Sequence, residues 1–385
     1  DAAFEEASTI SGASLATTLL RVVIPGLAPA VIVVFLLSLI RSFEAFEIEL
    51  VLGTPIRFQV YSTKIYALIN QSPVNYGAAT ALSMFILLAT LPLIFLQLWI
   101  SRRRSYTTIT GKARTTRTRL RSWRWPAAAL VLALAVLGTL LPVAFMLLGS
   151  FMGVFGYFDA REVWTLRHWA DVLGDPTFVG SVANTIVLGV GTAVAAVSLY
   201  SLMAYVTVRT RFGGRWAFDV LSWVPFTIPG IILGVAYLLF VLRTPVLTPL
   251  YGSMVVLIVV STLAVMTTAT QLLKGTMLQL GAELEEAAKT LGSSWWQTFR
   301  RIVVPLMAPS LVVAAVMTFA SAAREVSVII PVTSSATQPL AVLQLGYLLA
   351  GNQSSAAVIG SVTVVITVAA AICVRTLATR AGVRA

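Results

Sequence analysis

Few of the side chains that carry out chemistry occur in this chain. Its 385 residues include one cysteine, Cys373, and one histidine, His168, and only 11% of them are charged. A lone cysteine allows neither an internal disulfide nor a cysteine-ligated metal site. His168 lies between hydrophobic segments, where we expect an interfacial or loop residue. A membrane enzyme would need converging His, Cys, Asp or Glu side chains, so we predict no catalytic residue and no metal site.

Apolar residues take the place of the missing charges. They make up 58% of the sequence, and the mean hydropathy is +0.90. A soluble domain carries roughly 25% charged residues, so this chain cannot cover its surface with water-compatible groups. Its apolar stretches reach the roughly 20 residues that a bilayer-spanning helix needs. We therefore predict an all-α fold, a polytopic bundle of about eight transmembrane helices, near residues 27–48, 78–100, 126–150, 181–208, 217–242, 252–273, 307–329 and 355–375.

The charged residues predict how the chain lies in the bilayer. Nine of its 27 lysines and arginines lie between Arg102 and Arg124, and the positive-inside rule makes that segment cytoplasmic. The next loop, 151–180, carries four acidic residues against two arginines, which suits the outside. The later loops alternate in the same way. The bilayer therefore accounts for the basic clusters, and we predict no nucleic-acid partner.

A polar segment that leads into a proline occurs twice. The stretch Glu286–Pro305 has the same spacing of acid, small residue, glycine and proline as the stretch Glu6–Pro25, with Gly292 in the place of Gly12. Two such patterns at one constant offset indicate an internal duplication. In the second copy, Gly292 is expected to end a short helix, because glycine readily adopts the left-handed cap conformation. Pro305 is then expected to begin the next span.

The repeated segment resembles the cytoplasmic signature of binding-protein-dependent ABC importer permeases, Glu-Ala-Ala, three residues, Gly, nine residues, Ile-x-Leu-Pro. The second copy departs from it at Val304, and the first departs at three positions. The resemblance implies a type I importer permease fold in the bacterial inner membrane. It also implies that each segment is a coupling helix that docks on an ATPase subunit. The residues that would couple are Glu6, Ala7, Gly12, Pro25, Glu286, Ala287, Ala288, Gly292 and Pro305.

The resemblance also implies the partners. They are two copies of an ATPase subunit, which bind ATP and magnesium, and a periplasmic or lipid-anchored binding protein. No nucleotide-binding motif is found in the chain, so we expect it to bind no cofactor and not to be an enzyme. The pair Gly111-Lys112 lacks the spacing of a phosphate-binding loop.

The order of the parts resembles the ferric-iron group, in which two permease halves are fused. Residues 1–100 would be the end of a first half, 101–125 a basic cytoplasmic linker, and 126–385 a complete six-span second half. The linker segment Tyr106–Lys112 resembles the one between the halves in that group. Because the chain starts inside the first signature, we expect the natural protein to have further residues before Asp1.

The cargo stays open at this point. Ferric iron is the first hypothesis, and fused permeases for thiamine, phosphonate or a polyamine are alternatives, followed by a channel or secondary transporter. Carboxylate oxygens suit Fe(III), and acids near a membrane are often functional, although at the ends of spans they are also simply hydrated or paired. Proline breaks mark transport sites in some folds and are ordinary kinks in others. The candidate pathway residues are Glu44, Glu47, Glu325 and Pro229.

Overall fold

A computed structural model describes residues 8, 10–103, 124–159, 162–281 and 283–380. Within these ranges every regular element is a helix, and the sole extended pairing is an isolated bridge between Met152 and Trp164. The chain forms two compact units. The first comprises Asp1–Ala45 and Lys64–Pro142, and the second comprises Phe46–Thr63 and Val143–Ala385.

The first unit contains two long apolar helices that pack on each other, α3 and α6. The elements assigned to it are α2 (Leu15–Thr18), the π-helical turn η1 (Leu19–Val23), α3 (Ile24–Glu44), most of α5 (Tyr61–Asn70), α6 (Tyr76–Arg103), α7 (Arg124–Ala135) and the π-helical turn η3 (Val136–Leu140). The linker expected at 101–125 falls mostly outside the described residues.

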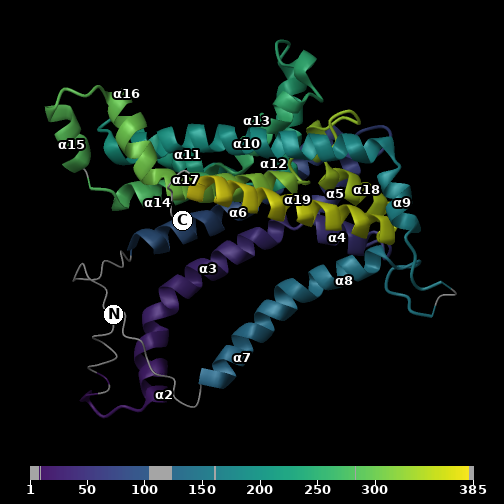
Figure 1. The fold of residues 1–385 in the computed structure, drawn as a ribbon, viewed down its shortest axis with the longest axis horizontal. Coiled ribbons are helices and arrows are strands. Elements are labelled where there is room, and N and C mark those ends of the chain that lie inside the picture. The colour runs from purple at the N-terminus through teal and green to yellow at the C-terminus, as the bar shows by residue number, and fades with distance from the viewer. Residues whose placement is uncertain (1–7, 9, 104–123, 160–161, 282, 381–385) are drawn as a thin grey trace. The chain divides into compact units, whose positions relative to one another are not determined.

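The second unit is a bundle in which α10, α17 and α19 run side by side (Figure 1). Its elements are α4 (Glu47–Gly53), nearly all of α8 (Leu141–Ser150), α9 (Arg167–Leu173), α10 (Pro176–Arg209), α11 (Arg215–Thr227), α12 (Gly230–Arg243), η4 (Thr248–Leu250), α13 (Met254–Ala264), α14 (Met266–Gln279), α15 (Glu283–Thr290), α16 (Trp295–Thr298), the π-helical turn η5 (Phe299–Val303), α17 (Val304–Ala323), η6 (Ile330–Val332), α18 (Leu340–Leu349) and α19 (Gln353–Arg380). Figure 1 places α15 and α16 at one end of this bundle and α9, α18 and α4 at the other.

The 34-residue helix α10 is the axis of this bundle. It begins at Asp175, whose side chain accepts a hydrogen bond from the Thr177 backbone N–H and so caps the helix. Small residues on α10 admit neighbouring helices. A Cβ on Gly189 would lie 2.6 Å from the Phe319 ring of α17. Close approach over small residues is how helices associate in a bilayer, where lipid is as apolar as the side chains.

The helices account for the expected membrane spans. Five helices in the described chain are long and apolar enough to cross a bilayer, and the number rises to seven if each of two bent pairs is one span. The 21-residue helix α3 covers the remaining expected span near 27–48. The all-α, polytopic expectation is therefore confirmed. Two spans end earlier than expected, α3 at Glu44 and α17 at Ala323.

The two bent pairs are α11 with α12, which turn through 111°, and α13 with α14, which turn through 54°. Pro225 lies inside α11 and Pro229 is the residue before α12. At the second bend the Tyr200 hydroxyl donates a hydrogen bond of 2.6 Å to the backbone carbonyl of Thr262. A break in a buried helix is tolerated where a neighbour satisfies the freed backbone group, and Tyr200 supplies that neighbour.

Candidate coupling loops and outer pocket

The segment between α14 and α17 contains two short helices, α15 and α16, with a turn at Gly292 between them. Leu280 leaves α14 with extended backbone, α15 follows, and Gly292 reverses the chain at φ +80°. A second short helix, α16, then starts with a capping box. The Ser294 hydroxyl accepts a bond from the Gln297 N–H, and the Gln297 side chain accepts one from the Ser294 N–H. The chain continues through η5 into α17, with Pro305 in its first turn.

The two adjacent glutamates of α15 point in different directions. Glu285 is only 7% exposed, whereas Glu286 is exposed. Successive residues of a helix lie about 100° apart around its axis, so one of them can face the bundle while the next faces outward. The buried face of α15 consists of Glu285 and Ala288, one turn apart. The predicted coupling residues Glu286 and Ala287 therefore lie on the outward face, and Ala288 does not.

Glu285 is held by the C-terminal end of α10. Its carboxylate accepts a hydrogen bond of 2.8 Å from the Tyr205 hydroxyl, and its other oxygen lies 3.1 Å from Nε of Arg209. The same guanidinium donates a hydrogen bond of 3.2 Å to the carbonyl of Met277 and a second to the carbonyl of Leu280. Arg209 thus holds the end of α14 and the first turn of α15 together.

An aromatic cluster joins α16 and η5 to α10. The Tyr205 ring meets Phe299 and Trp295 edge-on, with centroids 5.4 Å and 5.8 Å away. Trp295 and Trp296 each stack on Phe299. Edge-to-face and offset pairs at such separations are favourable beyond their burial. Tyr205 therefore contacts α15 through its hydroxyl and α16–η5 through its ring.

The first copy of the segment repeats this backbone within the first unit. Gly12 has φ +78°, and the elements α2 and η1 have the same lengths and the same places in the repeat as α16 and η5. The Thr17 N–H donates to the Ser14 hydroxyl over 3.3 Å, the same length as the equivalent bond in the second copy. Pro25 lies in the first turn of α3, as Pro305 does in α17. Glu6 and Ala7 lie outside the described residues.

At the opposite end of the second unit, predicted pathway residues lie close to one another. The Ser327 hydroxyl donates a hydrogen bond of 3.3 Å to the Glu47 carboxylate. The carboxylate of Glu325 accepts a 3.1 Å bond from the Val328 N–H, beyond the end of α17. Burial raises the pKa of the Glu325 carboxyl, and the nearby Glu47 charge adds to that rise. Glu44 belongs to the first unit, and its side chain is outside what the structure describes.

Pro229 joins this group through its neighbour. A Cβ on Gly230 would lie 3.0 Å from Cβ of Ser327, so the bend before α12 packs directly on the loop that carries Ser327. Pro229 itself is buried. The structure therefore brings Pro229, Glu47 and Glu325 to one region, as parts of one unit.

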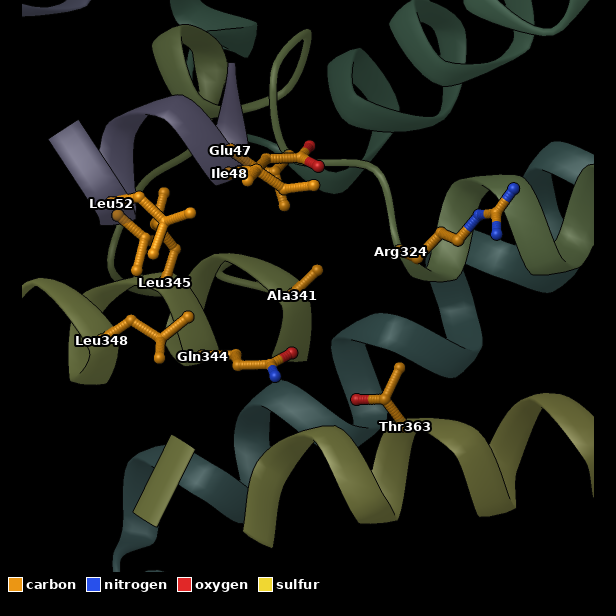
Figure 2. Close-up of a pocket in the computed structure, with 11 residues that line it drawn as sticks. Glu47, Ile48, Leu52, Arg324, Ala341, Gln344, Leu345, Leu348 and Thr363 are labelled. Carbon is orange, nitrogen blue, oxygen red and sulfur yellow. The ribbon is translucent and has the colours of Figure 1, made fainter. Parts of the chain in front are cut away.

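A pocket of about 380 Å³ opens beside Glu47 (Figure 2). Helix α4 forms one side, α18 another, and Thr363 of α19 lies across from α4. Four of the lining side chains are polar or charged and the others are apolar. The lining residues are Glu47, Ile48, Val51, Leu52, Arg324, Val326, Ala341, Gln344, Leu345, Leu348 and Thr363. Among the described residues no group of three or more His, Cys, Asp or Glu side chains could hold a metal ion.

Sequence reasoning missed three residues that hold α15 on the bundle, Tyr205, Arg209 and Glu285. Arg209 lies at the start of one of the later loops, where the positive-inside rule uses only its charge. One signal was available, because Tyr205 and Arg209 are four residues apart and so share a face of α10. Their partner in α15 could not be chosen from the adjacent pair Glu285 and Glu286 without knowing which face is buried.

Similar proteins point to one family. The family described as "Binding-protein-dependent transport system inner membrane component" matches residues 1–106 and 201–383. A "Putative ferric transport system permease protein FbpB 1" of Haemophilus influenzae is 30% identical over 87% of this chain and 52% of its own length. The "Ferric transport system permease protein FbpB" of Actinobacillus pleuropneumoniae is 29% identical over 95% of this chain and 53% of its own length. The chain thus spans about half the length of these relatives.

Shorter matches carry other cargo names. They include a molybdate/tungstate permease of Thermococcus kodakarensis, 30% identical over 41% of this chain and 62% of its own length. Among solved structures, a bacterial alginate ABC transporter in complex with a pentasaccharide-bound periplasmic protein gives a TM-score of 0.54. It covers 68% of this chain and 95% of the matched one, at 17% identity, which shows a shared fold. From these matches and the bundle of spanning helices, we conclude that the chain belongs to the inner-membrane permease family of binding-protein-dependent ABC importers.

Proposed function

We propose that this chain is the membrane-spanning permease subunit of an ATP-driven importer. The observation that carries the proposal is the coupling segment, the name we give to Glu286–Pro305 and to its first copy, Glu6–Pro25. Both copies have the same glycine turn, serine cap and π-helical turn. Each copy is followed without interruption by a long apolar helix, α3 or α17. A force applied to either segment would therefore act directly on a transmembrane helix.

The proposed partners follow from the two coupling segments, one in each unit, and from the end of the second unit that carries α9, α18 and α4. Two ATPase subunits would dock on the two coupling segments, and each would hydrolyse ATP with magnesium. A periplasmic or lipid-anchored binding protein would deliver cargo at the end that carries α9, α18 and α4. The permease itself would bind no nucleotide, and cargo would cross by alternating access between the two permease halves.

Ferric iron is the cargo that we propose. Two ferric permeases are similar over most of the chain, and carboxylates suit Fe(III) as a hard cation. Glu47 and Glu325 would then lie on the outer part of the pathway, with Pro229 beside them. A molybdate or sulfate importer is the second candidate, because shorter matches carry those names. The Glu47 carboxylate would disfavour an oxyanion, whereas Arg324, which lines the same pocket, would attract one.

The coupling role is tested by deleting Glu286–Gly292 from the full-length permease and asking whether it still co-purifies with its ATPase. We expect the deletion to abolish binding-protein-stimulated ATP hydrolysis and uptake. A matched deletion of equal length in the outer loop 151–165 should leave co-purification intact. Uptake that survives loss of Glu286–Gly292, or that needs no ATP, would refute the importer assignment in favour of a channel or secondary transporter.

The cargo is tested on the intact complex in vesicles loaded with ATP. Uptake of radioactive ferric iron should exceed uptake of molybdate or sulfate when the native binding protein is supplied. Glu47→Gln and Glu325→Gln should lower iron uptake, whereas Asp159→Asn, in the exposed outer loop, should not. Unchanged iron uptake in both glutamine variants would remove these two residues from the pathway, and transport of an oxyanion instead of iron would refute the ferric assignment.

A further inference from the structure

Three side chains connect the coupling segment to the longest helix of the bundle. Tyr205 and Arg209 project from the last two turns of α10, and Glu285 projects from α15 to meet them. Arg209 and Glu285 retain only 14% and 9% of their side-chain exposure. We call Tyr205, Arg209 and Glu285 the α10–α15 clamp.

The clamp restrains α15 in more than one direction. Tyr205 and Arg209 each meet the Glu285 carboxylate through a different oxygen, so the helix cannot roll without breaking one of the two contacts. Arg209 also bonds the carbonyls of Met277 and Leu280 at the end of α14. A guanidinium with five donors in a fixed plane suits such a junction, and a lysine does not reproduce it.

The clamp also decides what α15 presents to a partner. With Glu285 and Ala288 turned inward, the outward face carries Glu286 and Ala287 together with Leu284, which is 51% exposed. A change in the roll of α15 would bury Glu286 and remove it from that face.

Helix α10 extends from the clamp to the other end of the bundle. Over 34 residues it is roughly 50 Å long at 1.5 Å per residue. Near its far end, Asn184 donates hydrogen bonds of 3.0 Å and 3.2 Å to the carbonyls of Ala336 and Gln338. The Thr185 hydroxyl accepts a 2.8 Å bond from the Leu340 N–H. A displacement of α10 would therefore reach the outer loop that leads into α18.

We propose that Glu285 is a positioning residue through which movement of the coupling segment is passed to α10, and from there to the outer loop 336–340. This inference rests on the proposed function, because it needs an ATPase that moves α15. It adds a second route to the covalent one through α17, and the second route depends on Tyr205 and Arg209. If Glu285 only held α15 in place, its substitution would not change the amount of cargo transported per ATP.

The experiment compares single-atom-scale changes in the full-length permease, reconstituted with its ATPase and binding protein. Tyr205→Phe keeps the ring that packs on Phe299 and removes only the hydroxyl. Glu285→Gln keeps the shape and removes the charge. The matched control is Asp219→Asn, which breaks the 2.5 Å ion pair with Lys274 between α11 and α14 but does not touch α15.

The readout is cargo transported per ATP hydrolysed, together with ATPase co-purification. We expect Tyr205→Phe and Glu285→Gln to bind the ATPase and hydrolyse ATP while moving at least about fivefold less cargo per ATP. Fivefold is the low end of typical coupling between two sites. Asp219→Asn should keep the wild-type ratio.

Two results would overturn the clamp. One is a wild-type ratio in Tyr205→Phe and Glu285→Gln. The other is a loss of ATPase binding with an unchanged ratio in the complex that remains, which would assign Glu285 a structural role. If the wild-type permease bound no ATPase, the proposed function itself would fail, so the two failures are distinguishable.

Discussion

Substitution of Gly292 by alanine adds a single Cβ atom and so tests the left-handed turn of the coupling segment. Gly292 has φ +80°, and an added Cβ there would meet no atom within 4 Å. The change therefore adds no steric clash, and its cost comes from the backbone alone. An L-residue in the left-handed region costs roughly 1–2 kcal/mol, and alanine recovers about 0.4–1 kcal/mol by restricting the unfolded chain. The expected net destabilisation of the turn is about 1 kcal/mol.

Gly275 offers a matched control in the same region. It lies inside α14, where φ is negative, and its added Cβ also meets nothing within 4 Å. Alanine at this position should stabilise the helix by up to about 1 kcal/mol. The same chemical change is thus expected to have opposite effects on stability at two glycines of the second unit. Gly12→Ala, at φ +78° with equally open space, should behave like Gly292→Ala.

The assay measures the thermal midpoint of the purified permease in detergent and its affinity for the ATPase. Gly292→Ala should lower the midpoint and weaken ATPase binding about fivefold, the equivalent of about 1 kcal/mol. Gly292→Asn should recover most of the loss, since asparagine tolerates the left-handed conformation. Equal effects of Gly292→Ala and Gly275→Ala, or none at Gly292, would refute the assignment of Gly292 as a left-handed turn that docking requires.

Three further substitutions test other parts of the second unit. Because burial raises the pKa of Glu325 above its ordinary 4.5, the folded state takes up a proton more readily. Its stability should rise as the pH falls through the raised pKa, a slope in the melting temperature that Glu325→Gln should remove. Tyr200→Phe leaves the carbonyl of Thr262 without its 2.6 Å donor at the α13–α14 bend. This should cost about 1–3 kcal/mol in a denaturant titration, and an unchanged midpoint would contradict the role assigned to that hydroxyl. Gly189→Ala places a Cβ 2.6 Å from the Phe319 ring. Overpacking of about 1–3 kcal/mol is expected, and a more stable variant would show that α10 and α17 are not in close contact.

The sequence by itself determined the parts that depend on local chemistry. Apolar runs of bilayer length predicted helices because the backbone must satisfy its own hydrogen bonds in lipid. The spacing of glycine and proline in Glu286–Pro305 predicted a helix, a left-handed turn and a new span, and the same spacing in Glu6–Pro25 predicted its repeat. Gly12 and Gly292 both have positive φ, because glycine has no Cβ and adopts that conformation without a steric clash.

Only the tertiary structure decided which side chains face one another. Glu285 and Glu286 are identical in chemistry and adjacent in sequence, and packing against α10 buries the first and leaves the second exposed. Ser327 and Glu47 lie far apart in the sequence and meet through packing. Such pairings depend on which helix faces become neighbours. That choice belongs to the whole bundle, because no short stretch of sequence contains both partners.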